Sequence, residues 1–292
     1  MQWGDGADED AARQMYDACH ASGINHFDTA FVYTDGASET LLGKIAAADR
    51  DQLYIASKVG YLGGASRRII TAQFDESRKR LGFDTVDLLY LHRWDDEVPL
   101  EETFETMAQL QSTGAIRHIG VSNYAAWQVM KAQGVAADLG TRIDFIQPML
   151  NLVKRQAEVE IMPMAESEGI KVATYSPLGG GLLTGKYSRD ADAGRLATDA
   201  RYKARYGRNW MHRAAAGLQE IGAEIGVETA TLAVAWLAHH APRVRPILSA
   251  RTPRQLTPSL DAIGFQMPQD LFDRISALSQ TPANATDRLE EA

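Results

Sequence analysis

The sequence predicts an α/β fold, a (β/α)8 TIM barrel formed by a single domain over residues 1–292. Short apolar, β-branched runs alternate with longer segments of helical period, which is typical of βαβ units that build a parallel sheet. The ends of successive runs lie roughly 30 residues apart, the length of one such unit. The length of 292 residues is also usual for one barrel.

Seven runs are expected to be strands, and helices with one apolar stripe are expected between them. The first stripe is formed by Ala12, Met15, Tyr16 and Cys19. The expected strands are residues 24–28, 53–58, 86–92, 116–121, 145–147, 170–175 and 244–248.

The two ends of the predicted barrel are unusual. Only residues 1–4 remain for the first of eight strands, so we expect an N-terminally shortened stub there. The interval before the last strand is long, and residues 178–215 are therefore expected to form a long loop after strand seven. A helix is expected around residues 270–278, and residues 287–292 read as a charged tail.

Composition limits the classes of function. The formal net charge of −8 opposes binding to nucleic acid and to anionic membrane surfaces. Cys19 is the single cysteine, which excludes an intrachain disulfide and a cysteine-based zinc site. No secretory signal or long apolar run is visible in the sequence. A cytoplasmic location, with no nucleic-acid or membrane partner, is the expectation.

Four titratable residues fall at or just after the ends of predicted strands, where catalytic groups of parallel barrels lie. They are Asp28, Tyr33, Lys58 and His92. Taken singly, each is more often a packing or solvated residue than a catalytic one. Their order along the barrel favours a site, and a lysine among them argues against a metal ion. No metal ligand set is expected.

At these residues the chain resembles the aldo-keto reductase family, and the resemblance covers nearly the whole length. The motifs that carry it are Phe-Asp-Thr-Ala-Phe-Val-Tyr at 27–33, Ser-Lys at 57–58, Leu-Leu-Tyr-Leu-His at 88–92, Gly-Val-Ser-Asn at 120–123 and Tyr-Ser-Pro-Leu at 175–178. The resemblance implies that a nicotinamide cofactor delivers hydride to a carbonyl group.

The chemistry explains why these residue types are needed. A free tyrosine has a pKa near 10, and a nearby ammonium stabilises the phenolate and lowers that pKa. Tyr33 is therefore expected to protonate the substrate oxygen, with Lys58 beside it and Asp28 holding the lysine. His92 is expected to donate a hydrogen bond that orients the carbonyl.

The resemblance also implies a cofactor site, for NADPH with NADH as the alternative. Arg251 would bind the 2′-phosphate, and Tyr175 would stack on the nicotinamide ring. Leu248 and Ser249 replace a common Pro-Gly, and Ser259 replaces an asparagine that often contacts adenine. The expected cofactor residues are Ser122, Asn123, Gln147, Tyr175, Ser176, Leu178, Ser249, Arg251 and Gln255.

The substrate and the assembly stay open. Trp3, Tyr61 and Trp94 are expected to line an apolar substrate pocket. Sugar-derived aldehydes, small carbonyl compounds, aromatic aldehydes and quinones all fit, and the oligomeric state is undetermined. The alternative functions are a cofactor-binding regulatory subunit resembling potassium-channel β subunits and a catalytically inactive redox sensor.

Overall fold

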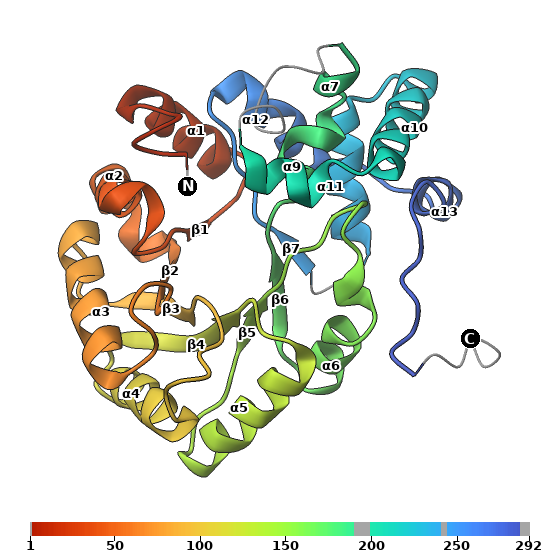
Figure 1. Ribbon diagram of the computed structural model, residues 1–292. Coiled ribbons are helices and arrows are strands. Elements are labelled where there is room, and N and C mark those ends of the chain that lie inside the picture. The colour runs from red at the N-terminus through yellow and green to blue at the C-terminus, as the bar shows by residue number, and fades with distance from the viewer. Residues whose placement is uncertain (1, 190–198, 241–243, 287–292) are drawn as a thin grey trace. The chain divides into compact units, whose positions relative to one another are not determined.

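The computed structural model of the chain describes residues 2–189, 199–240 and 244–286 (Figure 1). These residues form two compact units. Unit 1 comprises Met1–Gln147, Ser167–Lys171 and Ser249–Pro253. Unit 2 comprises Pro148–Glu166, Val172–Leu248 and Arg254–Ala292.

Unit 1 contains five parallel strands that pair in sequence order. Every residue of β3 (Val86–Leu91) is buried, and the one carboxylate among them, Asp87, accepts from the amide of Ile55 and pairs with Arg50, both at 2.8 Å. The register places Lys58 beside Tyr90 and Ser122 beside Gln147, so polar groups align at the carboxyl ends of the strands. The strands are β1 His26–Asp28, β2 Tyr54–Val59, β3 Val86–Leu91, β4 Ile116–Ser122 and β5 Phe145–Gln147.

Helices alternate with these strands, and α3, α4 and α5 lie along their outer side in Figure 1. The side chain of Asp8 caps α1 by accepting a hydrogen bond from the amide of Ala11 at 2.9 Å. The elements are α1 Glu9–Ala21, η1 Tyr33–Gly36, α2 Ala37–Ala46, η2 Ala47–Gln52, α3 Arg67–Leu81, α4 Leu100–Ser112 and α5 Ala126–Asp138.

Unit 2 contains β6 (Lys171–Thr174) and β7 (Val244–Pro246), which pair in parallel, and a larger helical portion. Its core includes Trp236 on α11, whose side chain is fully buried. The helical elements are η3 Gln156–Glu158, α6 Ile161–Ser167, η4 Gly179–Thr184, α7 Lys186–Arg189, α9 Ala200–Tyr206, α10 Asn209–Ile225, α11 Thr229–His239, α12 Pro253–Leu260, η5 Asp261–Ile263 and α13 Gln269–Ser276.

The observed elements confirm the predicted (β/α)8 class. In the described part of the chain each of the seven expected strands forms, within two residues of its expected bounds. The expected loop at 178–215 carries η4, α7, α9 and the start of α10, while residues 190–198 lie outside the described residues. The expected tail at 287–292 also lies outside them, and α13 covers most of the helix expected around 270–278.

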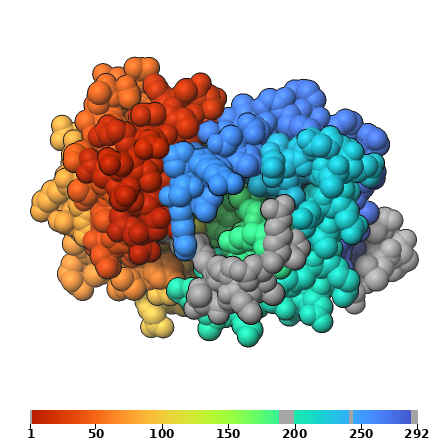
Figure 2. All heavy atoms as spheres, turned by 90° about the horizontal axis from the view of Figure 1, so that it is seen from above, coloured from red at the N-terminus to blue at the C-terminus, as the bar shows by residue number. Residues whose placement is uncertain are grey.

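The expectation that residues 1–4 form a stub of the first strand is wrong for the described residues. Trp3 forms a bridge with Ala7, so residues 2–7 make a local turn that pairs with itself. Gly4 leaves no room for a side chain against Ala37, which packs this turn on α2. Figure 2 shows the red N-terminal atoms against the orange atoms that follow them. The physical reason is the glycine at 4, with a φ of 87°, which turns the backbone out of extended geometry.

Candidate active site

Lys58 lies at the centre of a polar cluster within unit 1. Its side chain is fully buried near the carboxyl end of β2, and its ammonium donates to Asp28 Oδ1 and to the carbonyl oxygen of Thr29, the latter at 2.7 Å. Burial alone lowers the pKa of Lys58, but the charges and hydrogen bonds of Asp28 and Tyr33 outweigh burial and raise it. Lys58 is therefore a buried cation at neutral pH.

Tyr33 begins the short helix η1 and contacts the buried lysine. The Lys58 ammonium lies 4.9 Å from the centroid of the Tyr33 ring and makes a side-chain hydrogen bond with it. The backbone after the tyrosine is strained, because Thr34 and Asp35 have φ values of 48° and 51°. A strained, well-packed turn thus fixes the phenol next to the ammonium.

His92 follows β3 and completes the cluster. Its ring lies 5.8 Å from the Tyr33 ring, edge to face, and its side chain is buried. Burial and the positive charge of Lys58 lower the pKa of His92 to about 3, although Asp28 opposes the shift. The imidazole is therefore neutral at pH 7. Its buried Nδ1 has no hydrogen-bond partner among the described residues.

Three of the expected cofactor residues lie beside this cluster. Gln147 donates from Nε2 to Asp28 Oδ2 at 2.9 Å, so Asp28 is held between a lysine and an amide. Ser122 donates to the carbonyl oxygen of Gln147 at 2.9 Å. Asn123 donates to the carbonyl oxygen of His92 at 2.9 Å. This asparagine directly follows β4, and its φ of 59° is in the left-handed region.

A second buried network supports the same turn, and the sequence reasoning missed it. Glu39 on α2 is fully buried and accepts from Ser57 at 2.6 Å and from Arg80 at 3.3 Å. Arg80 also donates to the carbonyl oxygen of Phe31 at 3.0 Å. The signal that could have found Glu39 is its position on the apolar face of α2, between Ser38 and Leu42.

The remaining cofactor candidates are divided between the two units. In unit 1, Ser249 and Arg251 follow β7 in sequence, and Arg251 Nε donates to Gln2 Oε1 at 3.1 Å. In unit 2, Ser176 has a φ of 61°, and its carbonyl oxygen accepts from Asn151 at 2.8 Å. The others in unit 2 are Tyr175, Leu178 and Gln255, of which Gln255 is exposed.

The glycine turn of η4 in unit 2 brings a cation against the backbone. Gly179, Gly180 and Gly181 all have positive φ. A Cβ at Gly181 would lie 2.6 Å from the Lys186 ammonium, and the φ of 95° at this position is one that residues with a side chain rarely adopt. Within the turn, the amides of Gly179 and Gly181 donate at 2.9 Å to the carbonyl oxygens of Ser176 and Leu178.

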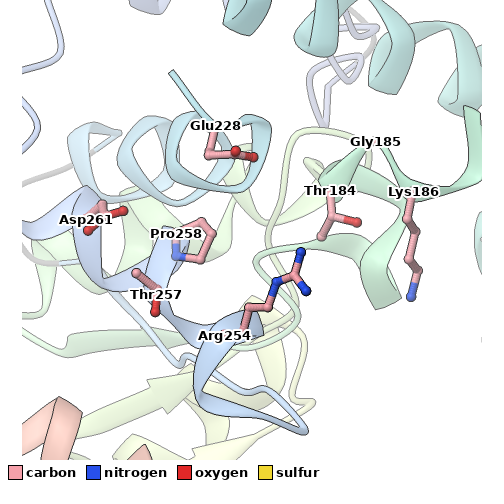
Figure 3. A pocket seen from close by; sticks show the side chains of 8 residues that line it. All are labelled: Thr184, Gly185, Lys186, Glu228, Arg254, Thr257, Pro258 and Asp261. Atoms are coloured by element: carbon pink, nitrogen blue, oxygen red, sulfur yellow. The ribbon is translucent and has the colours of Figure 1, made fainter. Parts of the chain in front are cut away.

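Unit 2 also contains a pocket of about 540 Å³, shown in Figure 3. Arg254 extends from α12 toward the segment that contains Thr184. Two carboxylates, Glu228 and Asp261, balance the charges of Arg254 and Lys186, which makes the pocket a poor receptor for a dianion. Its lining is completed by Gly185, Thr257 and Pro258.

The three expected substrate residues all lie in unit 1 but have different neighbours. The Tyr61 ring lies 5.0 Å from the His92 ring and is 42% exposed. Trp94 packs on Tyr124 and Trp127 at 5.1 and 5.6 Å. Trp3 lies in the N-terminal turn, where its carbonyl oxygen accepts from Thr34 at 2.8 Å. The structure thus places Tyr61 directly at the cluster.

The described residues also bear on metal binding and on membrane insertion. In the part of the chain that the structure describes, no three His, Cys, Asp or Glu residues are grouped so that they could hold a metal ion. No single described helix has the length and hydropathy needed to cross a bilayer. Helices α10 and α11 reach that limit only together, and they are bent by 103° at their junction.

Comparison with known proteins gives the family. The aldo/keto reductase family model matches residues 1–280. A probable voltage-gated potassium channel subunit beta of Oryza sativa subsp. japonica is 31% identical, covering 98% of this chain and 93% of its own. A protein of the same description in Arabidopsis thaliana is 33% identical over 86% of this chain and 81% of its own.

A third relative is described as an enzyme. Aflatoxin B1 aldehyde reductase member 2 of Rattus norvegicus is 36% identical over 64% of this chain and 53% of its own length. The family match spans nearly all of the sequence, including every residue of the buried cluster. The chain therefore belongs to the aldo/keto reductase family, a family of oxidoreductases that act on small carbonyl compounds.

Proposed function

We propose that this protein is an NADPH-dependent reductase that converts an aldehyde or ketone, including sugar-derived carbonyl compounds, to an alcohol. The observation that carries the proposal is the buried Lys58 ammonium, which contacts the Asp28 carboxylate and the Tyr33 phenol together. Burying a charged lysine is costly unless it is paired. An arrangement that pairs it with a carboxylate and places it against a tyrosine is suited to proton transfer from that tyrosine.

The residues present fit a nicotinamide. Gln147 is fixed by its bond to Asp28, and Ser122 and Asn123 are ordered by bonds around the same strand ends. Three ordered polar side chains beside the proposed proton donor suit the carboxamide group of the cofactor. When bound, NADPH supplies a hydride, one proton with two electrons, to the carbonyl carbon, so the carbonyl is reduced and the cofactor oxidised.

Each residue of the cluster has a part in the proposed proton transfer. Tyr33 gives its hydroxyl proton to the carbonyl oxygen as negative charge develops there, and the Lys58 ammonium stabilises the phenolate that remains. Asp28 holds the ammonium in place. His92, neutral at pH 7, offers an N–H to the same oxygen without placing a second full charge beside Lys58.

The other groups of the cofactor are assigned to residues of each unit separately. In unit 2, Ser176 and Leu178 are proposed to line the pyrophosphate, and Tyr175 is proposed as the ring partner. In unit 1, Arg251 is proposed to bind the 2′-phosphate that distinguishes NADPH from NADH. Ser249 and Gln255 complete the proposed set.

A cytoplasmic location is part of the proposal. It is supported by the net charge of −8 and by Cys19, the single cysteine of the sequence, whose thiol has a pKa raised to about 11 by burial. A chain with one cysteine forms no intrachain disulfide, which is consistent with a reducing compartment.

A second candidate function is a cofactor-binding regulatory subunit. It is favoured by the two plant relatives of high coverage, both described as probable potassium channel β subunits. The two candidates share the proposed cofactor and differ in turnover. A regulatory subunit needs no effective proton donor, whereas a reductase depends on one.

The test is NADPH oxidation with a panel of aldehydes, ketones and quinones by the wild type and by Tyr33→Phe. We expect turnover by the wild type and a loss of about a hundredfold or more in Tyr33→Phe, with the NADPH affinity unchanged, as measured by quenching of tryptophan fluorescence. NADPH binding without turnover by the wild type would move the assignment to the regulatory candidate. Near-normal turnover in Tyr33→Phe would refute the role of this tyrosine.

A further inference from the structure

Arg93 directly follows His92 in the sequence. The rings of Tyr33, His92 and Tyr61 form a row in that order, and the Arg93 guanidinium lies at the Tyr61 end of this row. The Tyr61 ring lies 5.0 Å from the His92 ring, and the Arg93 guanidinium carbon lies 5.1 Å from the centroid of Tyr61. A guanidinium over a tyrosine ring is held by a cation–π contact, which does not use the N–H donors of the guanidinium. The row of rings therefore ends in a positive charge.

Two of the three acidic residues at 95–97, Asp95 and Asp96, accept hydrogen bonds from groups other than Arg93. Asp95 accepts from the amides of Ala65 at 2.7 Å and Glu97 at 2.9 Å, which joins the loops after β2 and β3. Asp96 accepts from the Trp94 indole. Within the described residues Arg93 forms no ion pair, and its guanidinium contacts the Tyr61 ring. The hydrogen bonds of the Asp95 and Asp96 carboxylates are thus made with groups other than Arg93.

The other basic groups of the cluster cannot serve a second anion. The Lys58 ammonium is buried and donates hydrogen bonds to Asp28 and to the carbonyl oxygen of Thr29. His92 is neutral at pH 7, because burial and the Lys58 charge disfavour the imidazolium. A negative group on a substrate bound at this cluster would therefore meet Arg93, which lies over the Tyr61 ring.

Flat apolar surface accompanies this charge. Trp94 lies in the same loop as Arg93 and packs edge to face on Tyr124 and on Trp127, whose side chain is 61% exposed. Tyr61 is 42% exposed although its ring contacts His92. Exposed aromatic faces beside a reactive centre favour planar ligands, since ring stacking needs flat partners.

We propose that the substrate is an aromatic aldehyde or ketone that carries a carboxylate, and that Arg93 binds this carboxylate. The carbonyl group lies at Tyr33 and His92, the substrate ring packs on Tyr61, and the carboxylate faces the guanidinium. This inference rests on the proposed reductase function, because it assigns a further group of the same substrate. Arg93 is a specificity residue and takes no part in the proton or hydride transfer.

The experiment compares two substrates that differ in charge and hardly in shape, 4-carboxybenzaldehyde and its methyl ester, methyl 4-formylbenzoate. The kcat/KM of each is measured with NADPH for the wild type, Arg93→Gln and Arg93→Lys. A charge-assisted contact predicts that Arg93→Gln lowers kcat/KM for the carboxylate by about tenfold, with less than a threefold change for the ester. Arg93→Lys, which keeps the charge, should recover part of the loss.

The matched control is Arg67→Ala, an exposed arginine of unit 1 that pairs with Glu105 on the surface. It should change neither value. A readout without turnover is the affinity for 4-(hydroxymethyl)benzoate, followed by tryptophan fluorescence. That affinity should fall in Arg93→Gln by a similar factor.

The outcomes separate the two proposals. If the wild type reduces both aldehydes and Arg93→Gln lowers them equally, the carboxylate assignment is overturned while the reductase function stands. If the wild type reduces neither aldehyde nor any other carbonyl compound, the reductase function fails and this inference fails with it. Binding of the benzoate that is indifferent to Arg93→Gln would also overturn the assignment.

Discussion

The guanidinium of Arg80 on α3 donates at 3.3 Å to the fully buried carboxylate of Glu39 on α2. The same guanidinium lies 4.6 Å from the Phe31 ring centroid and would lie 2.5 Å from a Cβ at Gly36. Arg80 therefore packs behind the strained turn that carries Tyr33. The pair joins two helices to this turn, and Ser57, which also bonds Glu39, precedes Lys58 on β2.

Removing Arg80 should destabilise the protein strongly. Arg80→Ala leaves the Glu39 carboxylate buried without its counter-ion, which typically costs about 3–5 kcal/mol. We expect a loss near the lower value, because Ser57 still donates to Glu39. Urea denaturation at pH 7 measures the free energy of unfolding.

The control for this change is Arg67→Ala, since Arg67 lies on the same helix and pairs with Glu105 at an exposed site. Exposed pairs contribute about 0–1 kcal/mol. Adding Glu39→Gln to Arg80→Ala removes the orphaned charge and should restore part of the stability. Equal losses for Arg80→Ala and Arg67→Ala would contradict a supporting role of the buried pair.

Stability should decline below pH 6.5 through His92. The folded-state pKa of about 3 lies below the ordinary value of 6.5, so between these pH values the unfolded chain binds a proton that the folded chain does not. Stability from this group is complete above pH 6.5 and is lost as the pH falls toward 3. One such proton gives a slope of up to about 1.4 kcal/mol per pH unit.

This slope is measurable by urea unfolding at pH values between 7 and 4.5. His92→Gln cannot titrate and should show a shallower decline than the wild type, with a difference of about 2 kcal/mol at pH 5. His239→Gln, at an exposed position on α11, should decline like the wild type. A wild-type slope shared by His92→Gln would mean that other groups control the acid response.

The fold was largely predictable, because the alternation of apolar runs and helical stripes marks each strand of the described residues. The cluster at Asp28, Tyr33, Lys58 and His92 was also predictable, since strand ends of a parallel sheet bring such residues together. The N-terminal turn was not, because four residues carry no periodicity and Gly4 sets their path. The Glu39–Arg80 pair was missed because helical charges are usually solvated, and only packing shows that both face inward.

Lys58→Met should abolish most turnover while leaving the cofactor affinity close to that of the wild type. The ammonium contacts Tyr33 and Asp28, whereas Ser122 and Asn123, proposed for the carboxamide, do not bond to it. Gln147, the third residue proposed for the carboxamide, donates to Asp28 Oδ2, the carboxylate oxygen that does not accept from Lys58. Loss of one group that assists proton transfer typically costs about 10²–10⁴ in rate. Single-turnover kinetics with NADPH and fluorescence titration measure the two quantities.

The control for Lys58→Met addresses the charge left behind, because Asp28 loses its counter-ion. The double variant Lys58→Met with Asp28→Asn removes both charges and should regain stability without regaining turnover. Recovery of turnover in the double variant would indicate that the single change acts by disrupting the fold, and would remove Lys58 from the proposed proton transfer.

The preference for NADPH over NADH should depend on Arg251. A guanidinium that meets the 2′-phosphate contributes a charge-assisted contact, so Arg251→Ala should weaken NADPH binding by about tenfold and leave NADH binding nearly unchanged.

Arg254→Ala is the matched comparison, three residues further along and also exposed. Arg254 lines a pocket with Glu228 and Asp261, whose carboxylates disfavour a phosphate, so its effect should be smaller. Tryptophan fluorescence titration with both cofactors measures the four affinities. A selective loss of NADPH binding in Arg254→Ala alone would assign the 2′-phosphate contact to Arg254. Equal losses of NADPH and NADH binding in Arg251→Ala would mean that Arg251 contacts a group that both cofactors contain.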